Sequence, residues 1–392
     1  MRWMIQDLDQ TQEIVLREVI SHSGVSWVDG FAGSGKSIVA AHICNRLQRS
    51  TPSAKIALIT YTHALKEMLQ VGMNKLQASR VIVTTHTDLL KSDKKNIHYD
   101  VIVLDEVQDI PLSDIKKIKS MCTRLVLAGD VDQSIYANGI TAEDLRSNLQ
   151  PKEQRLRKIF RLTEKARRIA LSVLPNANVV AGENASNRAE ADIKRVNFND
   201  NGEEANWVYE DACNRARSDY PSGIFLTTHN EIRKFAELVA AGAGLPKPPR
   251  RAKSYINGGK NEDRYADFNA FWKSNGHPLR VLGSGSGDLS KSSNEPIVYL
   301  TTYHSAKGLD FQNVYLPRSV EGINLDPTGN GGEKLERRLM FVAITRTREN
   351  LFITHTGTRA HRYIEELPSA DIIRISNPKR HNFTQELGND IF

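Results

Sequence analysis

One stretch decides the fold of this chain: Gly30-Phe31-Ala32-Gly33-Ser34-Gly35-Lys36-Ser37. It matches the pattern G-x-x-x-x-G-K-[ST], whose glycines let backbone N–H groups close around phosphate oxygens. In such a loop Lys36 reaches the terminal phosphates of a nucleotide, and the Ser37 hydroxyl ligates Mg²⁺. The backbone at Gly33, Ser34 and Gly35 completes the cradle. The stretch therefore predicts a loop that binds ATP and Mg²⁺.

The residues on either side of this loop support the prediction. Residues 25–28 are apolar and indicate a buried strand, while residues 38–47 continue with helical periodicity. A helix that begins at the loop points its positive end at a bound anion. The alternative interpretation is a glycine turn before a helix. It is weak, because an accidental match is expected in only about one chain in a hundred of this length.

Length and charge bound the class of protein. The chain has 392 residues, of which 40% are hydrophobic, so it can bury two sizeable cores and two domains are expected. Lys and Arg outnumber Asp and Glu by 53 to 46. This excess favours a polyanionic partner, and ordinary solubility charge is the alternative.

Cysteine usage and hydropathy indicate a reducing compartment. Cys44, Cys122 and Cys213 are odd in number and widely scattered, so they form neither a disulfide framework nor a metal spacing. No charged-then-apolar signal segment opens the chain, and no apolar run approaches the length needed to cross a bilayer. We therefore expect a cytoplasmic protein without a membrane partner.

Apolar runs alternate with helical stretches, which is typical of an α/β fold with parallel sheets. A first series of strands is expected at residues 25–28, 55–60, 80–85, 101–105 and 124–128. A second series is expected at residues 193–198, 223–228, 278–283, 297–302, 313–317 and 350–354. We predict two α/β domains, at residues 1–150 and 151–392. Pro and Gly runs predict long surface loops at about residues 245–294 of the second domain.

A phosphate-binding loop needs an acidic partner at the end of another strand. The apolar residues 101–104 end in Asp105 and Glu106. Asp105 can hold Mg²⁺, and Glu106 can polarise the attacking water. Acidic pairs at strand ends are common. The signal becomes specific through the runs Asp105-Glu106-Val107-Gln108-Asp109 and Gly129-Asp130-Val131-Asp132-Gln133-Ser134-Ile135-Tyr136.

With these runs the chain resembles the UvrD/Rep family of superfamily 1 helicases, whose motor consists of two RecA-like domains with ATP bound between them. Leu8-Asp9-Gln10-Thr11-Gln12 is similar to the glutamine motif of the family, which implies that Gln12 reads adenine. Residues 129–136 resemble the third motif. The resemblance implies that Gln133 senses the terminal phosphate and couples it to the DNA track.

The resemblance also implies which residues contact a single strand. Thr60-Tyr61-Thr62-His63-Ala64 is similar to the first strand-contacting motif, and Thr84-Thr85-His86-Thr87 to the next. The nucleic-acid-binding residues that it implies are Thr60, Tyr61, His63, Thr85, His86, Tyr136, Thr302 and His304. Phosphates held by polar groups and bases stacked on aromatic rings give binding that is largely indifferent to sequence. Single-stranded DNA is the expected partner, and RNA is not excluded.

The second domain supplies the remaining motifs. Ile159-Phe160-Arg161 resembles the Asn-Tyr-Arg motif of the family, which implies that Phe160 packs on adenine and Arg161 reaches the γ-phosphate. Residues 302–311 closely match the fifth motif, which places Gly308 at the nucleotide and puts Asp310 where the family normally has Glu near the ribose. Residues 336–348 resemble the sixth motif, which makes Arg346 the arginine finger. The catalytic residues implied are Lys36, Glu106, Gln133, Arg161 and Arg346.

Each of these residues also has an ordinary structural explanation. Arg161 and Arg346 could be solvated arginines on helices, Phe160 a core aromatic, and His304 a loop histidine satisfied by backbone. Taken singly, the ordinary and the functional explanations are about equally good. The order and register of these motifs along the chain favour the functional explanation.

The chain departs from the family by being compact. Only a short stretch separates His86 from Asp105, so the first helical insert of the family is essentially missing, and the second domain is too short for the usual second insert. Ala137-Asn138-Gly139 replaces an expected aromatic and Arg-Gly, which leaves Tyr136 as the base platform there. The missing inserts and the missing aromatic residue weigh against strand separation more than against ATP hydrolysis.

Three functions therefore compete. The leading one is an ATP-dependent motor on single-stranded DNA, moving 3′ to 5′ as the resemblance implies, in repair or antiphage defence with a partner such as a nuclease. The second is a nucleotide-dependent switch or clamp that regulates a partner, and the third is an RNA-directed motor.

The basic run at residues 246–253 has two interpretations, a solvated loop and a contact with phosphate or a partner. We favour the solvated loop at odds of about two to one, because short charge runs are usually solvated. Residues 283–287 are expected to form a flexible connection, and the tail after Pro378 a disordered end or a docking segment.

Overall fold

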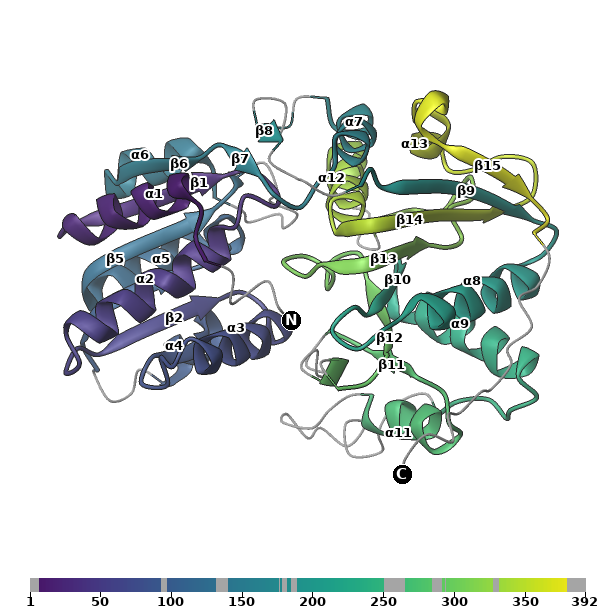
Figure 1. The fold of residues 1–392 in the computed structure, drawn as a ribbon, viewed down its shortest axis with the longest axis horizontal. Helices are drawn as coiled ribbons and strands as arrows, with labels where there is room; N and C mark the ends of the chain where they lie inside the picture. The colour runs from purple at the N-terminus through teal and green to yellow at the C-terminus, as the bar shows by residue number, and fades with distance from the viewer. Residues whose placement is uncertain are drawn as a thin grey trace.

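The computed structural model describes residues 7–92, 97–131, 140–175, 177, 182–184, 189–249, 265–283, 291–292, 294–326 and 331–378. Within these residues two parallel sheets form the two halves of the molecule, each with helices packed against it (Figure 1). The predicted α/β fold with two parallel-sheet domains is confirmed. Its halves are the two RecA-like domains that the resemblance implies.

The first half is a six-stranded sheet in the order β3-β2-β4-β5-β1-β6. All pairings between these strands are parallel. The strands are β1 (Val25–Gly30), β2 (Ile56–Thr60), β3 (Ile82–Thr85), β4 (Tyr99–Leu104), β5 (Cys122–Gly129) and β6 (Lys152–Leu156). The five strands predicted for this domain are confirmed, since parallel strands covered on both faces are apolar throughout.

Strand β6 has no counterpart among the predicted strands. Its sequence, Lys-Glu-Gln-Arg-Leu, is polar, and it lies at the edge of the sheet with most of its side chains exposed. It pairs with β1, from Ser26 opposite Lys152 to Gly30 opposite Leu156. The first sheet therefore includes residues that the predicted boundary at 150 assigns to the second domain. An edge strand is covered on fewer sides than a central one, so no apolar run marks it in the sequence.

Helices pack on both faces of the first sheet. Alternate residues of each strand point to opposite faces, as Val28 and Trp27 of β1 do, and each belongs to a different hydrophobic cluster. One cluster includes α1 (Gln10–Ser21), α2 (Lys36–Ser50) and α3 (His63–Lys75). The other includes α4 (His86–Ser92), α5 (Leu112–Ser120) and α6 (Ala142–Leu149). This three-layer arrangement leaves the carboxyl ends of the strands free to carry a site.

The second half is a seven-stranded sheet in the order β11-β12-β10-β13-β14-β9-β15, again with parallel pairings. The strands are β9 (Asp192–Phe198), β10 (Ser222–Leu226), β11 (Leu279–Val281), β12 (Val298–Thr302), β13 (Phe311–Leu316), β14 (Thr347–Thr356) and β15 (Ile373–Ser376). The six predicted strands of this domain are confirmed. The seventh, β15, is an exposed edge strand and was missing from the prediction for the same reason as β6.

The helices of the second domain also divide between two faces. The helices α7 (Glu164–Val173) and α12 (Gly332–Ile344) pack together on one face, and α8 (Asn201–Arg215), α9 (His229–Gly242) and α11 (Ala266–Ser274) lie on the other. Helix α11 interrupts the segment predicted as loops. Its buried side chains Phe268 and Trp272 are four residues apart, which is a helical signal within a Pro- and Gly-rich region.

Smaller elements complete the described chain. They are η3 (Val107–Asp109), the two-stranded sheet of β7 (Lys158–Ile159) and β8 (Glu183–Asn184), α13 (Arg362–Glu365) and η7 (Ser369–Asp371). One hydrophobic cluster continues from the first domain into the second, because it holds Phe31 and Leu65 together with Ile159 and Leu309. This shared core brings the two halves of the site together. Among the described helices, none has the length and apolar character to traverse a bilayer.

Candidate active site and nucleic-acid interface

The phosphate-binding loop joins the end of β1 to the start of α2, as predicted. Gly33 and Gly35 have φ angles of 78° and 88°, which lie in the left-handed region that favours glycine. Space is also short at both positions. A Cβ atom on Gly33 would lie 2.5 Å from Cβ of Arg161, and one on Gly35 would lie 2.4 Å from Nε2 of Gln12. Both glycines are therefore required by backbone conformation and by close neighbours.

Lys36 lies at the start of α2 with its side chain folded into the loop. Its Nζ donates hydrogen bonds to the carbonyl oxygens of Gly30, at 2.8 Å, and Phe31, at 3.1 Å. The Ser34 hydroxyl is buried and has no hydrogen-bond partner among the described residues. A buried polar group without a partner is costly, and a phosphate oxygen would satisfy it. The loop is thus suited to hold an anionic group.

Asp105 follows β4 and fits a cation. Its side chain is 1% exposed, and neither carboxylate oxygen has a hydrogen-bond partner in the described part of the chain. Burial, together with the charge of Glu106, raises the pKa of Asp105 to about 7, and the neighbouring Ser37 and Lys36 only partly oppose the rise. A bound Mg²⁺ would pair both orphaned oxygens. Ser37 and Asp105 are the residues that would hold it, with the phosphates completing the shell.

Glu106 is held in place by Gln108. Gln108 Nε2 donates to Glu106 Oε2 at 2.5 Å, and Gln108 Oε1 accepts from the backbone N–H of Asp130 at 3.1 Å. Burial works against ionisation of Glu106, but the charges of Lys307, Lys36 and Arg346 hold its pKa below the ordinary value. The carboxylate is therefore ionised at neutral pH and can orient a water. In the sequence, the position of Gln108 two residues after Glu106 is the only signal of this role.

Two arginines of the second domain face this cluster. The backbone N–H of Phe160 donates to the carbonyl oxygen of Gly33 at 2.9 Å, so the residues next to Arg161 are fastened to the phosphate-binding loop. Arg346 is buried and donates to the carbonyl oxygens of Val342, at 3.0 Å, and Leu309, at 3.1 Å. Burial and the charge of Arg161 lower the pKa of Arg346 to about 9, while Glu106 opposes the shift. The predicted finger thus lies close to both Arg161 and Glu106.

The loop after β12 closes the cleft from the second domain. Lys307 Nζ donates to Asp109 Oδ1 at 2.7 Å, and both side chains of this ion pair are almost fully buried. Gly308 has a φ of 79°, and a Cβ atom there would lie 3.4 Å from Glu106 Oε1. The fifth motif therefore packs directly on Glu106 and Asp109 of the run that follows β4.

Asp310 has partners that the sequence did not indicate. Its carboxylate forms ion pairs with Arg161, at 3.5 Å, and with Arg348. Burial raises the pKa of Asp310, but the charges of Arg348 and Arg161 outweigh it and hold the pKa below the ordinary value. The structure thus brings Asp310 to the arginines, and its contact with a ribose stays a prediction.

The side chain of Gln12 also forms hydrogen bonds within the protein. Its Oε1 accepts from the backbone N–H of Asp9 at 3.1 Å in a capping box of α1, and its Nε2 donates to the carbonyl oxygen of Ser34 at 3.0 Å. Gln12 therefore connects α1 to the phosphate-binding loop. Reading of adenine by Gln12, and packing of the half-buried Phe160 on adenine, stay predictions.

The predicted strand-contacting residues of the first domain cluster after β2 and β3. The rings of Tyr61 and His86 stack at 5.1 Å between centroids and 13° between planes. His63 is exposed, with Nδ1 3.9 Å from Asp88. Thr60 and Thr85 are fully buried, and Thr85 Oγ1 accepts from the backbone N–H of Asp88 at 3.2 Å. Tyr61 and His63 are the accessible members of this group.

In the second domain the predicted contacts lie at the carboxyl end of β12. Thr302 Oγ1 accepts from the backbone N–H of Ser305 at 3.1 Å, which shapes the turn that carries His304. Burial lowers the pKa of His304, so the ring is neutral at pH 7. Strands β2 and β12 both lie in the lower half of the view in Figure 1. Gln133 and Tyr136 lie outside the described residues, as do residues 250–253 of the basic run, residues 284–287 and the tail from residue 379.

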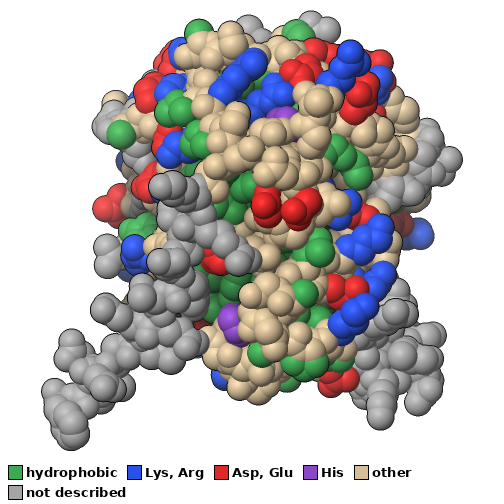
Figure 2. Space-filling model, turned by 90° about the vertical axis from the view of Figure 1, so that its right-hand side faces the viewer, with side chains coloured by type: hydrophobic (Ala, Val, Ile, Leu, Met, Phe, Trp, Pro, Cys, Tyr) green, Lys and Arg blue, Asp and Glu red, His purple; other side chains and the backbone are tan. Residues whose placement is uncertain are grey.

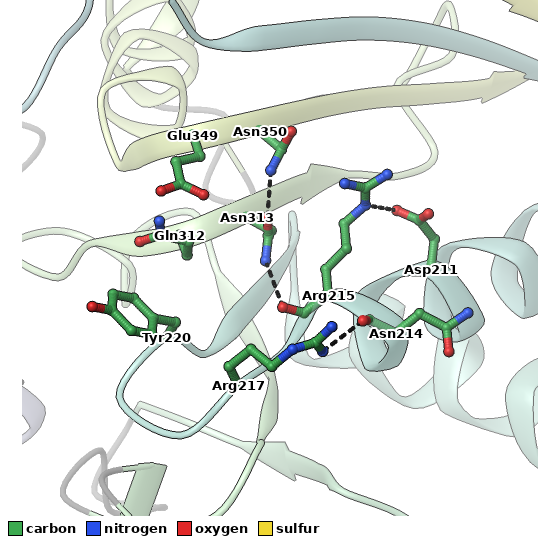
Figure 3. Close-up of a pocket in the computed structure, with 9 residues that line it drawn as sticks. All are labelled: Asp211, Asn214, Arg215, Arg217, Tyr220, Gln312, Asn313, Glu349 and Asn350. Atoms are coloured by element: carbon green, nitrogen blue, oxygen red, sulfur yellow. Dashed lines mark hydrogen bonds and ion pairs between the residues drawn. The ribbon is translucent and has the colours of Figure 1, made fainter. Parts of the chain in front are cut away.

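Other surfaces offer weaker sites. On the face shown in Figure 2, basic and acidic side chains are interspersed, and its described part carries no continuous band of one sign. A cavity of about 640 Å³ opens at the amino ends of β10, β13 and β14 and is lined by Asp211, Asn214, Arg215, Arg217, Tyr220, Gln312, Asn313, Glu349 and Asn350 (Figure 3). Its arginines are engaged by Asp211 and by the carbonyl oxygen of Asn214. It includes none of the predicted site residues.

Comparisons with known proteins agree with this geometry. The family model of the AAA domain matches residues 11–139, and that of the UvrD-like helicase C-terminal domain matches residues 254–358. DNA helicase II of Rickettsia typhi is 38% identical over 100 residues, which are 22% of this chain and 15% of that protein. ATP-dependent DNA helicase PcrA of Staphylococcus aureus is 32% identical over 108 residues, which are 24% of this chain and 15% of that protein.

The alignments thus span about a seventh of the length of these curated relatives. Among solved structures, the arterivirus nonstructural protein 10 helicase in complex with DNA aligns with a TM-score of 0.40 and 14% identity. That alignment covers 87% of this chain and 62% of the viral chain. At so low a TM-score the likeness bears on neither substrate nor mechanism.

Proposed function

The chain belongs to the UvrD/Rep-like helicases of superfamily 1, and from this premise we propose that it hydrolyses ATP to move along single-stranded DNA. The observation that carries the proposal is the meeting of Lys36, Asp105 and Glu106 with Arg161 and Arg346 across one cleft. Movement from 3′ to 5′ follows from the family resemblance. A role in repair or antiphage defence with a nuclease is part of the same proposal.

Each residue of the cleft has a part in the proposed reaction. Bound Mg²⁺, held by Ser37 and Asp105, would neutralise charge on the terminal phosphates. Lys36 leaves the carbonyl oxygens of the loop and binds the phosphates instead. Glu106, oriented by Gln108, aligns the attacking water. Arg161 and Arg346 neutralise charge that develops in the transition state, and arginines in such positions contribute about 10³ to 10⁵ in rate.

Closure of the cleft would couple this chemistry to movement. A triphosphate between the domains attracts the two arginines, and hydrolysis removes part of that attraction. The Lys307–Asp109 pair and the contact of Gly308 with Glu106 connect the loop after β12 to the catalytic carboxylate. That same loop begins with the predicted strand contacts Thr302 and His304. A change at Glu106 can therefore be transmitted to a bound strand.

The compact build limits the proposal to translocation. In the described part of the chain, α4 is followed directly by β4, and no helical insert grips a duplex there. Strand separation would then depend on a partner. Robust ATP-driven unwinding by the isolated chain would contradict this part of the proposal.

The first experiment is steady-state ATP hydrolysis by the purified chain, alone and with single-stranded DNA, duplex DNA or RNA. Glu106→Gln is the blank, because it keeps the size of the side chain and removes the charge. Strong stimulation by single-stranded DNA alone supports the proposed motor. Stimulation by RNA instead would favour an RNA-directed motor of the same fold.

A second candidate function is a nucleotide-dependent switch. The buried Lys307–Asp109 ion pair favours it, because a tight connection between the domains suits two discrete states. Slow hydrolysis that no nucleic acid changes, but that a protein partner changes strongly, would support the switch and exclude a self-sufficient motor.

A further inference from the structure

Three arginines of the second domain lie close to one buried carboxylate, that of Asp310. Arg161, Arg346 and Arg348 surround Asp310, which is 3% exposed and pairs with Arg161 and Arg348 through the same oxygen, Oδ2. Burial and the charge of Arg161 lower the pKa of Arg346, while the charges of Glu106, Asp310 and Asp130 oppose the shift. Asp310 is thus the carboxylate that Arg161 and Arg348 share.

The two partners of Asp310 are held with unequal strength. The Arg161 Nε to Asp310 Oδ2 distance is 3.5 Å, which is longer than a good charge-assisted hydrogen bond, and Arg161 Nη1 makes an equally long contact with the carbonyl oxygen of Thr345. Arg348 Nε forms a shorter hydrogen bond with the same carboxylate oxygen. Arg161 is thus the partner that can leave, and Arg348 the one that stays.

The position of Arg161 gives it a second possible partner. Its Cβ lies directly over Gly33, and the N–H of the preceding Phe160 is bonded to the Gly33 carbonyl oxygen. The backbone of Arg161 therefore belongs to the phosphate-binding loop, while its guanidinium reaches into the second domain. Arg161 therefore lies between Asp310 and the phosphate-binding loop.

We propose that Asp310 is a positioning residue that competes with the terminal phosphate for Arg161, so that Arg161 exchanges one anion for the other while Arg348 keeps the carboxylate paired. The inference rests on the proposed function, since it requires a triphosphate in the cleft. The exchange leaves no buried charge unpaired. A lone aspartate abandoned by its only arginine would resist the exchange, because breaking a buried pair is strongly destabilising.

The test is the ratio of affinities for a triphosphate and a diphosphate, measured by titration calorimetry with AMP-PNP and ADP in the presence of Mg²⁺ and without nucleic acid. Asp310→Asn removes the competing anion, so AMP-PNP should bind about five- to tenfold more tightly relative to ADP. Arg348→Gln leaves Asp310 with Arg161 alone, so the ratio should move in the opposite direction by about threefold or more.

Three controls separate this role from a structural one. Asp371→Asn removes an exposed pair with Arg168 and should leave the ratio unchanged. In an Arg161→Gln background, Asp310→Asn should no longer alter the ratio, because the effect acts through Arg161. Asp310→Glu keeps the carboxylate and should restore the behaviour of the unaltered chain. Thermal unfolding of each nucleotide-free variant reports whether it is folded, and Arg348→Gln still tests the exchange if Asp310→Asn is not.

The outcomes distinguish the exchange from other roles of Asp310. Equal changes for AMP-PNP and ADP would overturn it. Weaker binding of both nucleotides that disappears with their 2′-deoxy forms would identify Asp310 as a ribose ligand instead. If the unaltered chain binds neither nucleotide, the proposed function fails together with the exchange. If it binds both and the variants leave the ratio unchanged, only the exchange fails.

Discussion

The two halves of the cleft are built in different ways. In the first domain, Lys36 and the pair Asp105 and Glu106 come from two short stretches, each of which directly follows a parallel strand. In the second domain, Arg161, Asp310 and Arg346 come from segments far apart in the sequence and contact one another through charged groups. Local backbone structure builds one half, and long-range charge pairing builds the other. The second half should therefore be the more sensitive to substitutions outside its motifs.

The largest effect is expected from Arg346→Ala. The three donors of Arg346 that bind Val342, Leu309 and Thr345 fix the guanidinium near Glu106, the proposed catalytic carboxylate. Its loss should lower kcat for ATP hydrolysis by about 10³- to 10⁵-fold. Arg168→Ala, which removes an exposed arginine of the same domain, is the control in the same assay. A similar fall in kcat for Arg346→Ala and Arg168→Ala would mean that the buried arginines of the second domain have no special role in hydrolysis.

The next effect concerns stability. Lys307→Met should leave Asp109 buried without its ion-pair partner and lower the free energy of unfolding by about 3–5 kcal/mol. The double variant Lys307→Met/Asp109→Leu should recover most of that loss, since an apolar pair replaces the charges. Urea denaturation of the full chain measures both. A single variant as stable as the unaltered chain would show that the pair between the domains is not needed.

Gln108→Leu tests the local half. Without the hydrogen bond from Gln108, Glu106 is misplaced, and kcat should fall by about 10²-fold. The pKa of Glu106 lies below its ordinary value, so activity is lost only as the pH falls through that pKa. Removing the donor raises the pKa, and the acidic limb of the pH profile should move to higher pH. An unchanged limb together with a lower kcat would assign Gln108 a different role.

The smallest effect is expected at the surface. Arg17→Ala removes an exposed pair with Glu13 on α1, with 3.2 Å between Arg17 Nε and Glu13 Oε1. The free energy of unfolding, measured by urea denaturation, should change by no more than about 0.5 kcal/mol. A much larger change would mean that exposed pairs also hold the first domain together, which would blur the contrast between its local motifs and the buried charges of the second.

The central strands of both sheets could be predicted because they are buried on both faces. The edge strands β6 and β15 could not, since polar side chains suit an exposed edge and leave no pattern. The first sheet therefore extends past residue 150 to include β6. Helix α11 was hidden in a segment whose Pro and Gly runs dominated the prediction, although Phe268 and Trp272 carried a helical signal.

The candidate site divides in a similar way. Lys36, Asp105 and Glu106 could be placed from the sequence, because a glycine loop between a strand and a helix and an acidic strand end each have local signals. The pairing of Asp310 with Arg161 and Arg348 could not be predicted from the sequence. The hydrogen bond from Gln12 to the phosphate-binding loop could not be predicted either. A charged or amide group binds whichever partner the fold brings near it.

Residue types and short spacings were enough to predict a parallel α/β fold in two domains, the phosphate-binding loop and the identity of the facing arginines. These features depend on residue type and on spacing over a few residues, which fix backbone conformation and burial. The pairing of Asp310 with Arg161 and Arg348, and that of Lys307 with Asp109, became visible only in the folded chain. Electrostatic interactions in a buried cleft depend on distances of a few ångströms between residues far apart in the chain, and sequence spacing carries no information about them.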